Sequence, residues 1–194
     1  LGDEDADEKE IVGRFFDGIG KYTPDLVSWN GGGFDLPVLH YRALKLGVQA
    51  ARYWENGQND RDFKWNNYLS RYHWRHTDLM DVLANFNPRA NAKLDEIASM
   101  LGFPGKLGMD GSKVWGAYRE GGIRDIRDYC ETDVLNTYLV YLRHRLHTGA
   151  IPLDGYNKAV ADIIALIEAE GDARPHLGAF LEAWAAASGN RFML

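Results

Sequence analysis

A run of three glycines, residues 31–33, follows an apolar segment and limits the secondary structure that this part of the chain can form. Residues 25–29 (Asp-Leu-Val-Ser-Trp) follow Pro24 and predict a short buried strand. Residues 30–35 (Asn-Gly-Gly-Gly-Phe-Asp) end that strand, and a helix is predicted from near Phe34 to Gly47. A strand, a glycine turn and a helix in this order indicate an α/β fold, in which ligands commonly bind at the carboxyl edge of the sheet.

The glycine turn allows a functional and a structural interpretation. Glycines let the backbone come close to a ligand without side chains in the way, and Asp35 would point its carboxylate toward that edge. In the structural alternative, Asn30 caps the turn and Asp35 only complements the helix dipole. Because short motifs match by chance so often, this motif alone favours the structural alternative.

A second acidic motif lies about a hundred residues downstream. Residues 129–133 (Tyr-Cys-Glu-Thr-Asp) fall inside a long amphipathic helix predicted from Ile123 to about His147. At this spacing Tyr129 and Asp133 share one helix face, with Cβ atoms roughly 5–6 Å apart. A phenol and a carboxylate placed in this way can converge on one bound water. The structural alternative is a solvated Asp133 beside a core tyrosine.

The remaining periodicity predicts a largely helical chain. Residues 49–72 and the glycine-punctuated residues 105–122 are expected to be loops, and residues 73–77 a strand. Thr77 or Asp78 is expected to cap the helix that follows. Further helices are predicted around Ile11, Phe15, Phe16 and Ile19, over residues 93–101, and over residues 156–170 and 175–187.

Composition excludes several classes of protein. The 194 residues are 45% hydrophobic, which suits a globular chain with a real core. The net charge of −6 argues against a protein that coats duplex DNA. A single cysteine, Cys130, excludes an internal disulfide and favours a reducing, cytoplasmic setting. No apolar run reaches the ~18 residues of a membrane span, so no membrane partner is expected.

The two motifs in this order resemble the second and third motifs of DnaQ-like, ribonuclease-H-like 3′–5′ exonucleases, in the subgroup whose third motif carries Tyr. The chain is most similar to the bacterial predicted 3′–5′ exonucleases related to the proofreading domain of family B DNA polymerases. The matching stretches cover most of residues 25–145, namely residues 27–35, 78–81, 94–98, Gly105-Lys106, 110–112 and 129–133.

That resemblance implies a fold, a reaction and a set of site residues. It implies an α/β ribonuclease-H-like domain, a mixed sheet flanked by helices, and hydrolysis with two Mg²⁺ or Mn²⁺ ions as cofactors. Asp35 and Asp133 are implied as metal ligands, and Tyr129 as the residue that orients the attacking water. Asn30 and Phe34 would bind the 3′-terminal nucleotide.

Two lysines are weaker candidates for substrate binding. Lys106 and Lys113 lie in the glycine-punctuated segment and could contact phosphates along a single strand. A solvated loop is the plainer interpretation of both.

The sequence departs from the resemblance at its N-terminus. The first motif should supply Asp-x-Glu on a strand, but residues 3–10 are a charged run with no apolar strand around it. We therefore expect the N-terminal strands of the domain to be missing from this chain, which as printed carries half of a metal site. The expected domains are an exonuclease-like domain over residues 1–150 and a helical C-terminal extension over residues 151–194.

Three hypotheses about function follow. The leading one is a metal-dependent 3′–5′ exonuclease that acts on single-stranded DNA or 3′ ends. The second is an inactive nucleic-acid-binding or scaffolding module that lacks the first acidic motif. The third is a metal-free binding domain whose motifs match by chance.

Overall fold

The computed structural model describes residues 2–3 and 5–194. It divides into two compact units, the first reaching to Asn91 and the second beginning at Ala92, and each is described by itself. Leu1 and Glu4, which belong to the acidic opening, lie outside the described residues. The domain boundary expected at residue 150 stays a prediction.

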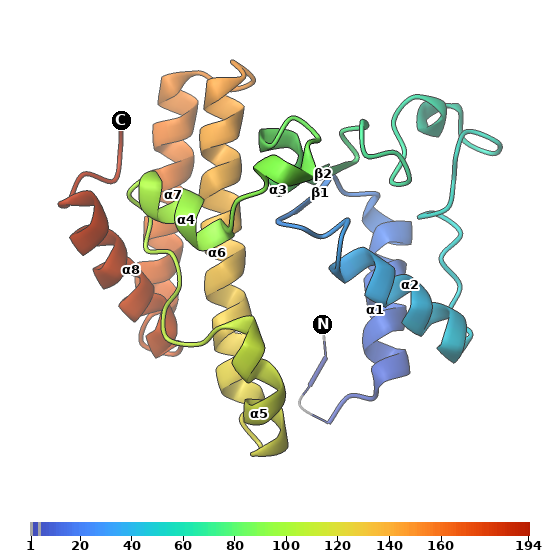
Figure 1. Ribbon diagram of the computed structural model, residues 1–194, viewed down its shortest axis with the longest axis horizontal. Coiled ribbons are helices and arrows are strands. Elements are labelled where there is room, and N and C mark those ends of the chain that lie inside the picture. The colour runs from blue at the N-terminus through green and yellow to red at the C-terminus, as the bar shows by residue number, and fades with distance from the viewer. Residues whose placement is uncertain (1, 4) are drawn as a thin grey trace. The chain divides into compact units, whose positions relative to one another are not determined.

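The first unit begins with a helix that the acidic opening helps to start. Helix α1 spans Glu8–Tyr22, and the Asp7 side chain accepts a hydrogen bond from the Glu10 amide at 2.8 Å. The predicted helix is confirmed; Phe16 and Ile19 on it are buried, whereas Ile11 is exposed. Helix α2 (Asp35–Leu46) lies beside α1 and ends at Gly47, where φ is 67° (Figure 1).

Two short parallel strands form the sheet of the first unit. Strand β1 (Leu26–Ser28) pairs with β2 (His76–Asp78), and the helix α3 (Leu79–Leu83) follows β2 directly (Figure 1). The strand expected at residues 73–77 begins later because the Arg75 amide donates to Asn66 Oδ1 at 2.8 Å. The described residues combine helices with this parallel pair, and the larger ribonuclease-H-like mixed sheet is not confirmed.

The segment between α2 and β2 has little regular structure, as expected, but it is well packed. It contains the 3-10 turn η1 (Arg61–Lys64). Phe63 is fully buried between the guanidinium groups of Arg52 and Arg75, whose centres lie 4.2 and 4.1 Å from the ring centroid. Tyr68 donates to the Pro24 carbonyl at 2.6 Å, so the segment is fastened to the chain just before β1.

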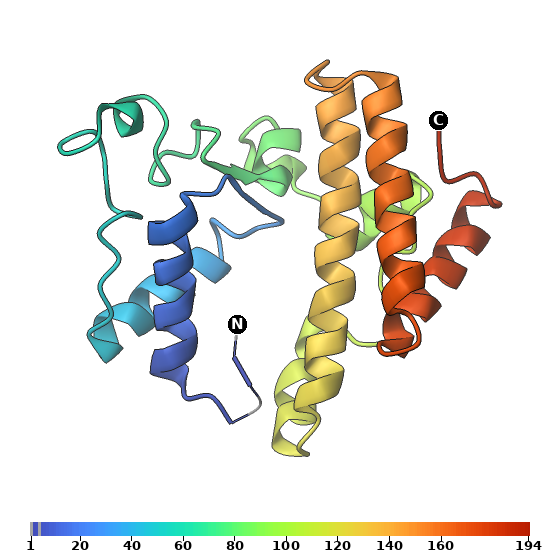
Figure 2. The ribbon, with the colours of Figure 1, turned by 180° about the vertical axis from the view of Figure 1, so that it is seen from behind.

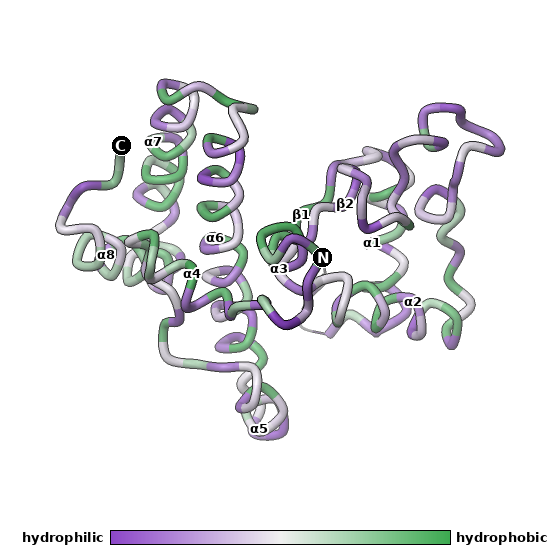
Figure 3. The backbone as a smooth tube through the Cα atoms, turned by 45° about the horizontal axis from the view of Figure 1, so that its top comes forward, coloured by the Kyte–Doolittle hydropathy of each residue, from purple (hydrophilic) through white to green (hydrophobic). Residues whose placement is uncertain are grey.

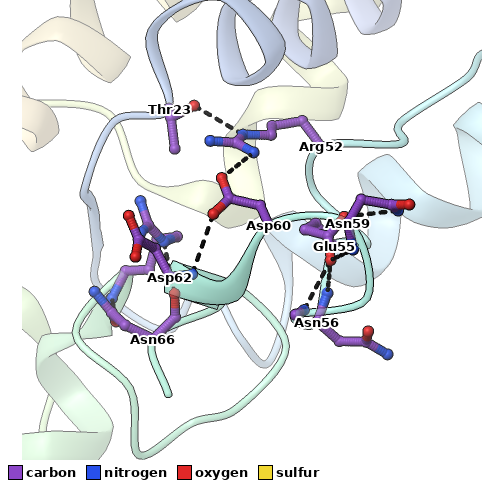
Figure 4. A network of polar contacts seen from close by, with 10 residues as sticks. Thr23, Arg52, Glu55, Asn56, Asn59, Asp60, Asp62 and Asn66 are labelled. Atoms are coloured by element: carbon purple, nitrogen blue, oxygen red, sulfur yellow. Dashed lines mark hydrogen bonds and ion pairs between the residues drawn. The ribbon is translucent and has the colours of Figure 1, made fainter. Parts of the chain in front are cut away.

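A buried carboxylate organises the start of this segment. Glu55 Oε1 accepts hydrogen bonds from the amides of Asn56, Gly57 and Asn59, and Oε2 accepts one from the Asn59 side chain (Figure 4). These bonds, the Asn59 side chain foremost, lower the pKa of Glu55 to about 2. Close by, Arg52 Nη1 donates a hydrogen bond to Asp60 Oδ2 at 2.7 Å. Glu55 therefore holds the backbone through Oε1 and the Asn59 side chain through Oε2.

Helices packed on one long helix form the second unit. α6 (Ile123–His147) contacts α4 (Leu94–Met100), α5 (Val114–Arg119), α7 (Leu153–Glu170) and α8 (Pro175–Ser188), and Figure 2 shows α6 and α7 side by side. Trp184 is almost fully buried, with ring centroids 5.9 Å from Phe103 and 5.0 Å from Phe192. The C-terminal helices predicted from periodicity are confirmed.

The segment expected to be a loop at residues 105–122 is only partly one. It contains the 3-10 turn η3 (Gly111–Lys113) and α5, so that prediction was wrong for residues 111–119. Asp110 starts η3 by accepting from the Ser112 amide at 2.8 Å. Gly116 lies inside α5, and a glycine there costs about 1 kcal/mol relative to alanine. A short helix with an internal glycine gives little periodic signal.

Apolar and polar residues alternate along the helices of both units (Figure 3). Another 3-10 turn, η2 (Pro88–Ala90), precedes the end of the first unit. Within the described chain no helix has the length and apolar character needed to cross a membrane.

An imidazole lies among aromatic rings in the first unit. The His40 ring lies 4.7 Å from Tyr53 and 5.0 Å from Trp54, measured between ring centroids. Its Nε2 is buried and has no hydrogen-bond partner among the described residues. Burial lowers the pKa of His40 below its ordinary value of 6.5. The folded state therefore favours the neutral ring.

We predict that the folded state loses stability as pH falls below about 6.5, because the unfolded chain then binds more protons. Burial lowers the pKa of His76 and His144 in the same direction. His40→Phe keeps an aromatic ring but cannot titrate. The fall in urea midpoint between pH 7.5 and pH 5.5 should be smaller in this variant than in the wild type. An equal fall in wild type and His40→Phe would contradict the assignment.

Candidate active site

The glycine turn carries the chain from β1 into α2. Asn30 adopts a left-handed φ of 63°, and its carbonyl accepts the amides of Gly33 and Phe34 at 3.1 and 3.0 Å. A Cβ atom on Gly33 would lie 2.4 Å from Asn30 Oδ1, so a larger residue there would require the Asn30 side chain to move. The turn ends at Asp35, the first residue of α2. The predicted strand, turn and helix are confirmed.

A carboxylate from the neighbouring strand holds this turn. Asp78 occupies the N-cap position of α3, yet its side chain makes no capping bond, so the predicted capping role was wrong. Instead, Oδ1 accepts the Asn30 amide at 2.8 Å and Oδ2 accepts the Gly32 amide at 2.9 Å. The strand register places Asp78 opposite Ser28, close to where the turn begins. Nothing local in the sequence signals this contact, because it spans 46–48 residues.

The glycine turn packs on a hydrogen-bonded pair of polar side chains, Ser28 and His76. Ser28 Oγ and His76 Nε2 lie 2.8 Å apart, and His76 is 8% exposed. A Cβ atom on Gly31 would lie 2.3 Å from Ser28 Oγ, so the turn packs directly on this pair. Burial lowers the pKa of His76, against the opposing charge of Asp78. Sequence reasoning missed both residues.

The candidate ligand Asp35 stands in an unfavourable electrostatic position. Burial raises its pKa, and the negative charge of Asp78 raises it further, while its own backbone amide opposes the shift. The neighbouring Phe34 is 64% exposed. An anion that the protein itself destabilises in this way is one that a bound cation would stabilise.

The second motif lies in the second unit, on α6. Tyr129 and Asp133 lie one helical turn apart on α6, so the predicted shared face is confirmed. Burial raises the pKa of Asp133, while its interaction with the Tyr129 phenol and the charge of Lys106 oppose the rise. Burial, followed by the interaction with Asp133, raises the pKa of Tyr129. The two side chains are therefore close enough to affect each other's ionisation.

A buried amide holds Lys106 beside this pair. Asn136 is 1% exposed; its Nδ2 donates to the Gly105 carbonyl at 2.8 Å and its Oδ1 accepts the Gly105 amide at 3.3 Å. Asp95 Oδ1 accepts the Lys106 amide at 2.7 Å. Gly105 has a φ of 67°, and a Cβ atom there would lie 2.4 Å from Asp95 Oδ1. Asn136 lies three residues after Asp133, which explains why Lys106 is near that carboxylate.

The predicted site residues therefore fall into two groups. Asn30, Phe34 and Asp35 lie together in the first unit, and Lys106, Tyr129 and Asp133 lie together in the second. Lys113 ends η3, where its charge and that of Lys106 lower the pKa of Asp110, after the bonds from Ser112. Within the described residues, no three or more His, Cys, Asp or Glu side chains are grouped so that they could hold a metal ion.

Comparison with known proteins identifies the family. Residues 1–184 match the family described as predicted 3′–5′ exonucleases related to the exonuclease domain of PolB. The chain belongs to this family. The match reaches well beyond the residues 25–145 that carry the motifs, and it includes α7 and most of α8.

Short stretches of curated polymerases are also similar to the chain. A stretch of 40 residues is 52% identical to DNA polymerase 1 of Saccharolobus solfataricus, and 39 residues are 51% identical to DNA polymerase 1 of Sulfurisphaera ohwakuensis. These stretches cover 21% and 20% of the chain but only 4% of either polymerase. No solved structure matches the chain significantly.

We predict that Asp78→Ala destabilises the first unit by about 2 kcal/mol or more, because two amides lose a charged acceptor. Urea unfolding measures the loss, and amide hydrogen exchange at Asn30 and Gly32 should become faster. Asp81→Ala is the matched control, since it removes only the ion pair with Arg71, an interaction typically worth about 0–1 kcal/mol. Equal losses in both variants would contradict the assigned role of Asp78.

We also predict that Asn136→Ala destabilises the second unit. Each buried Gly105 group left without a partner costs about 1–3 kcal/mol. Thr137→Val is the control, because that hydroxyl only donates back to the Asp133 carbonyl within α6. Thermal unfolding of the two variants measures the difference. An unchanged unfolding temperature for Asn136→Ala would show that the hydrogen bonds between Asn136 and Gly105 do not stabilise the second unit.

Proposed function

We propose that this chain is the core of a metal-dependent 3′–5′ exonuclease that hydrolyses single-stranded DNA or frayed 3′ ends and releases nucleoside monophosphates. Membership of the exonuclease family supports a nuclease. The observation that carries the proposal within the structure is the pair of carboxylates, Asp35 and Asp133, whose pKa values burial raises. Perturbed carboxylates of this kind concentrate at functional sites.

The donor chemistry suits Mg²⁺ or Mn²⁺. Carboxylate oxygens are hard ligands, and Asp35 and Asp133 are the residues that would hold the ions. Bound there, such ions would supply positive charge that stabilises phosphodiester hydrolysis. Exonucleases of this kind usually use divalent metals, which is consistent with the proposal.

The neighbouring side chains have roles that follow from their contacts. Tyr129 lies on the same face of α6 as Asp133 and would orient the attacking water. Lys106 brings a positive charge beside Asp133 and would bind a phosphate of the strand, with Lys113 further along the same segment. In the other unit, Phe34 offers an exposed ring for a terminal base or sugar, and Asn30 would hydrogen-bond the same nucleotide.

A second candidate function is an inactive nucleic-acid-binding or scaffolding module. The observation in its favour is that the described residues group fewer than three potential metal ligands in any one place. The residues on the printed chain would then still bind a strand without cleaving it. A measurement of cleavage by the protein separates the two candidates.

The test is degradation of a 5′-labelled oligonucleotide, read as a ladder of 3′-shortened products with Mn²⁺. Asp35→Asn and Asp133→Asn should each abolish the ladder, and Tyr129→Phe should slow it by about a hundredfold or more. Asp154→Asn, at an exposed carboxylate in the first turn of α7, is the control and should leave the rate unchanged. Undiminished cleavage in either aspartate variant would sink the assignment, and a wild type without any ladder would favour the scaffold.

A further inference from the structure

Two exposed aromatic rings are stacked on the helix α5. Trp115 is 68% exposed and Tyr118 is 57% exposed, yet their ring centroids lie only 5.9 Å apart with planes inclined by 24°. The spacing of three residues places both rings on one face of the helix. The described structure thus presents a flat, apolar surface made of two aligned rings.

The core of the second unit does not account for this pair. α5 contributes no buried residue, whereas Phe180 and Trp184 elsewhere in the unit are almost fully buried. Exposing large aromatic rings to water is unfavourable, and neighbouring exposed rings often mark a binding surface. Trp65 offers a comparison, because it is 78% exposed but has no aromatic partner among its described ring contacts.

The local charge favours an anionic partner. The whole chain has a net charge of −6, but residues 106–124 carry four basic and two acidic side chains. Lys113 lies two residues before Trp115, Arg119 directly follows Tyr118, and both basic side chains are exposed. Aromatic faces flanked by cations fit a strand of nucleic acid with unpaired bases. A duplex fits poorly, because its base faces are covered.

We propose that Trp115 and Tyr118 form a stacking platform for unpaired bases, with Lys113 and Arg119 contacting the phosphates on either side. This inference rests on the proposed function, and it assigns the substrate strand a binding surface outside the candidate catalytic residues.

The platform lies in the same unit as half of the candidate site. α5 lies beside α6, the helix that carries Tyr129 and Asp133 (Figure 1). The Gly122 amide donates to the Ala117 carbonyl at 2.8 Å and so joins the end of α5 to the start of α6. A nucleic-acid strand that stacks on α5 would therefore lie next to α6, the helix that carries Tyr129 and Asp133.

The experiment separates binding from cleavage. In an Asp133→Asn background with Ca²⁺, fluorescence anisotropy measures the binding of a fluorescein-labelled oligothymidylate to the full-length protein. Trp115→Ala combined with Tyr118→Ala should raise the dissociation constant about tenfold or more. Trp115→Phe with Tyr118→Phe keeps the rings and should bind close to the parent, which separates stacking from a folding defect. Trp65→Ala is the control for losing an exposed tryptophan.

Each outcome decides the matter. The platform is overturned if the double alanine variant binds like the parent, or if Trp65→Ala loses as much. It is also overturned if the double variant changes the oligomeric state while the oligonucleotide affinity stays the same, since a second copy of the chain would then occupy the rings. Cleavage by the wild type is measured separately. If the wild type does not cleave but the binding loss persists, the exonuclease proposal fails and the platform stands.

Discussion

Hydrogen bonds from the backbone to the Asp78 carboxylate fix the positions of the candidate site residues in the first unit. Three glycines in a row have no conformation of their own, since each can adopt positive and negative φ at little cost. Two hydrogen bonds from Asn30 and Gly32 to one carboxylate select a single path for the turn. That path starts α2 at Asp35 and leaves Phe34 exposed. The sheet contributes by register, because only a strand paired Ser28 to Asp78 brings that carboxylate to the turn.

The acidic side chains of this protein have two different kinds of role. Asp78 accepts a backbone amide with each of its two oxygens. Glu55 accepts three backbone amides and the Asn59 side-chain amide, and these bonds hold its pKa far below the ordinary value. Asp35 and Asp133 show the opposite, because burial disfavours their charge. Carboxylates that accept several hydrogen bonds fix the conformation of the local backbone. A carboxylate whose charged form is destabilised by burial would be stabilised by a bound cation. This contrast separates structural from candidate functional residues without reference to any relative.

Much of this could be predicted from the sequence, and the failures have physical causes. The strand, turn and helix around residues 26–46 and the Tyr129–Asp133 pair follow from local periodicity, and the structure confirms them. The roles of Asp78 and Asn136 could not be read, because each contacts a backbone 31–48 residues away. α5 was missed because Gly116 breaks its pattern. The family match supports a nuclease, whereas the predicted metal ligands and substrate contacts stay predictions.

A net charge of −6 is compatible with a nucleic-acid ligand if the strand is held by few phosphates and by stacking. Counterion release makes affinity fall with salt in proportion to the number of phosphates neutralised, so a protein with few basic contacts gains little from that source. Base stacking on aromatic faces does not depend on net charge and tolerates any sequence. Exposed Phe34 in one unit and the Trp115–Tyr118 pair in the other supply such faces. An acidic exonuclease that grips unpaired bases is therefore physically consistent, whereas an acidic duplex-coating protein is not.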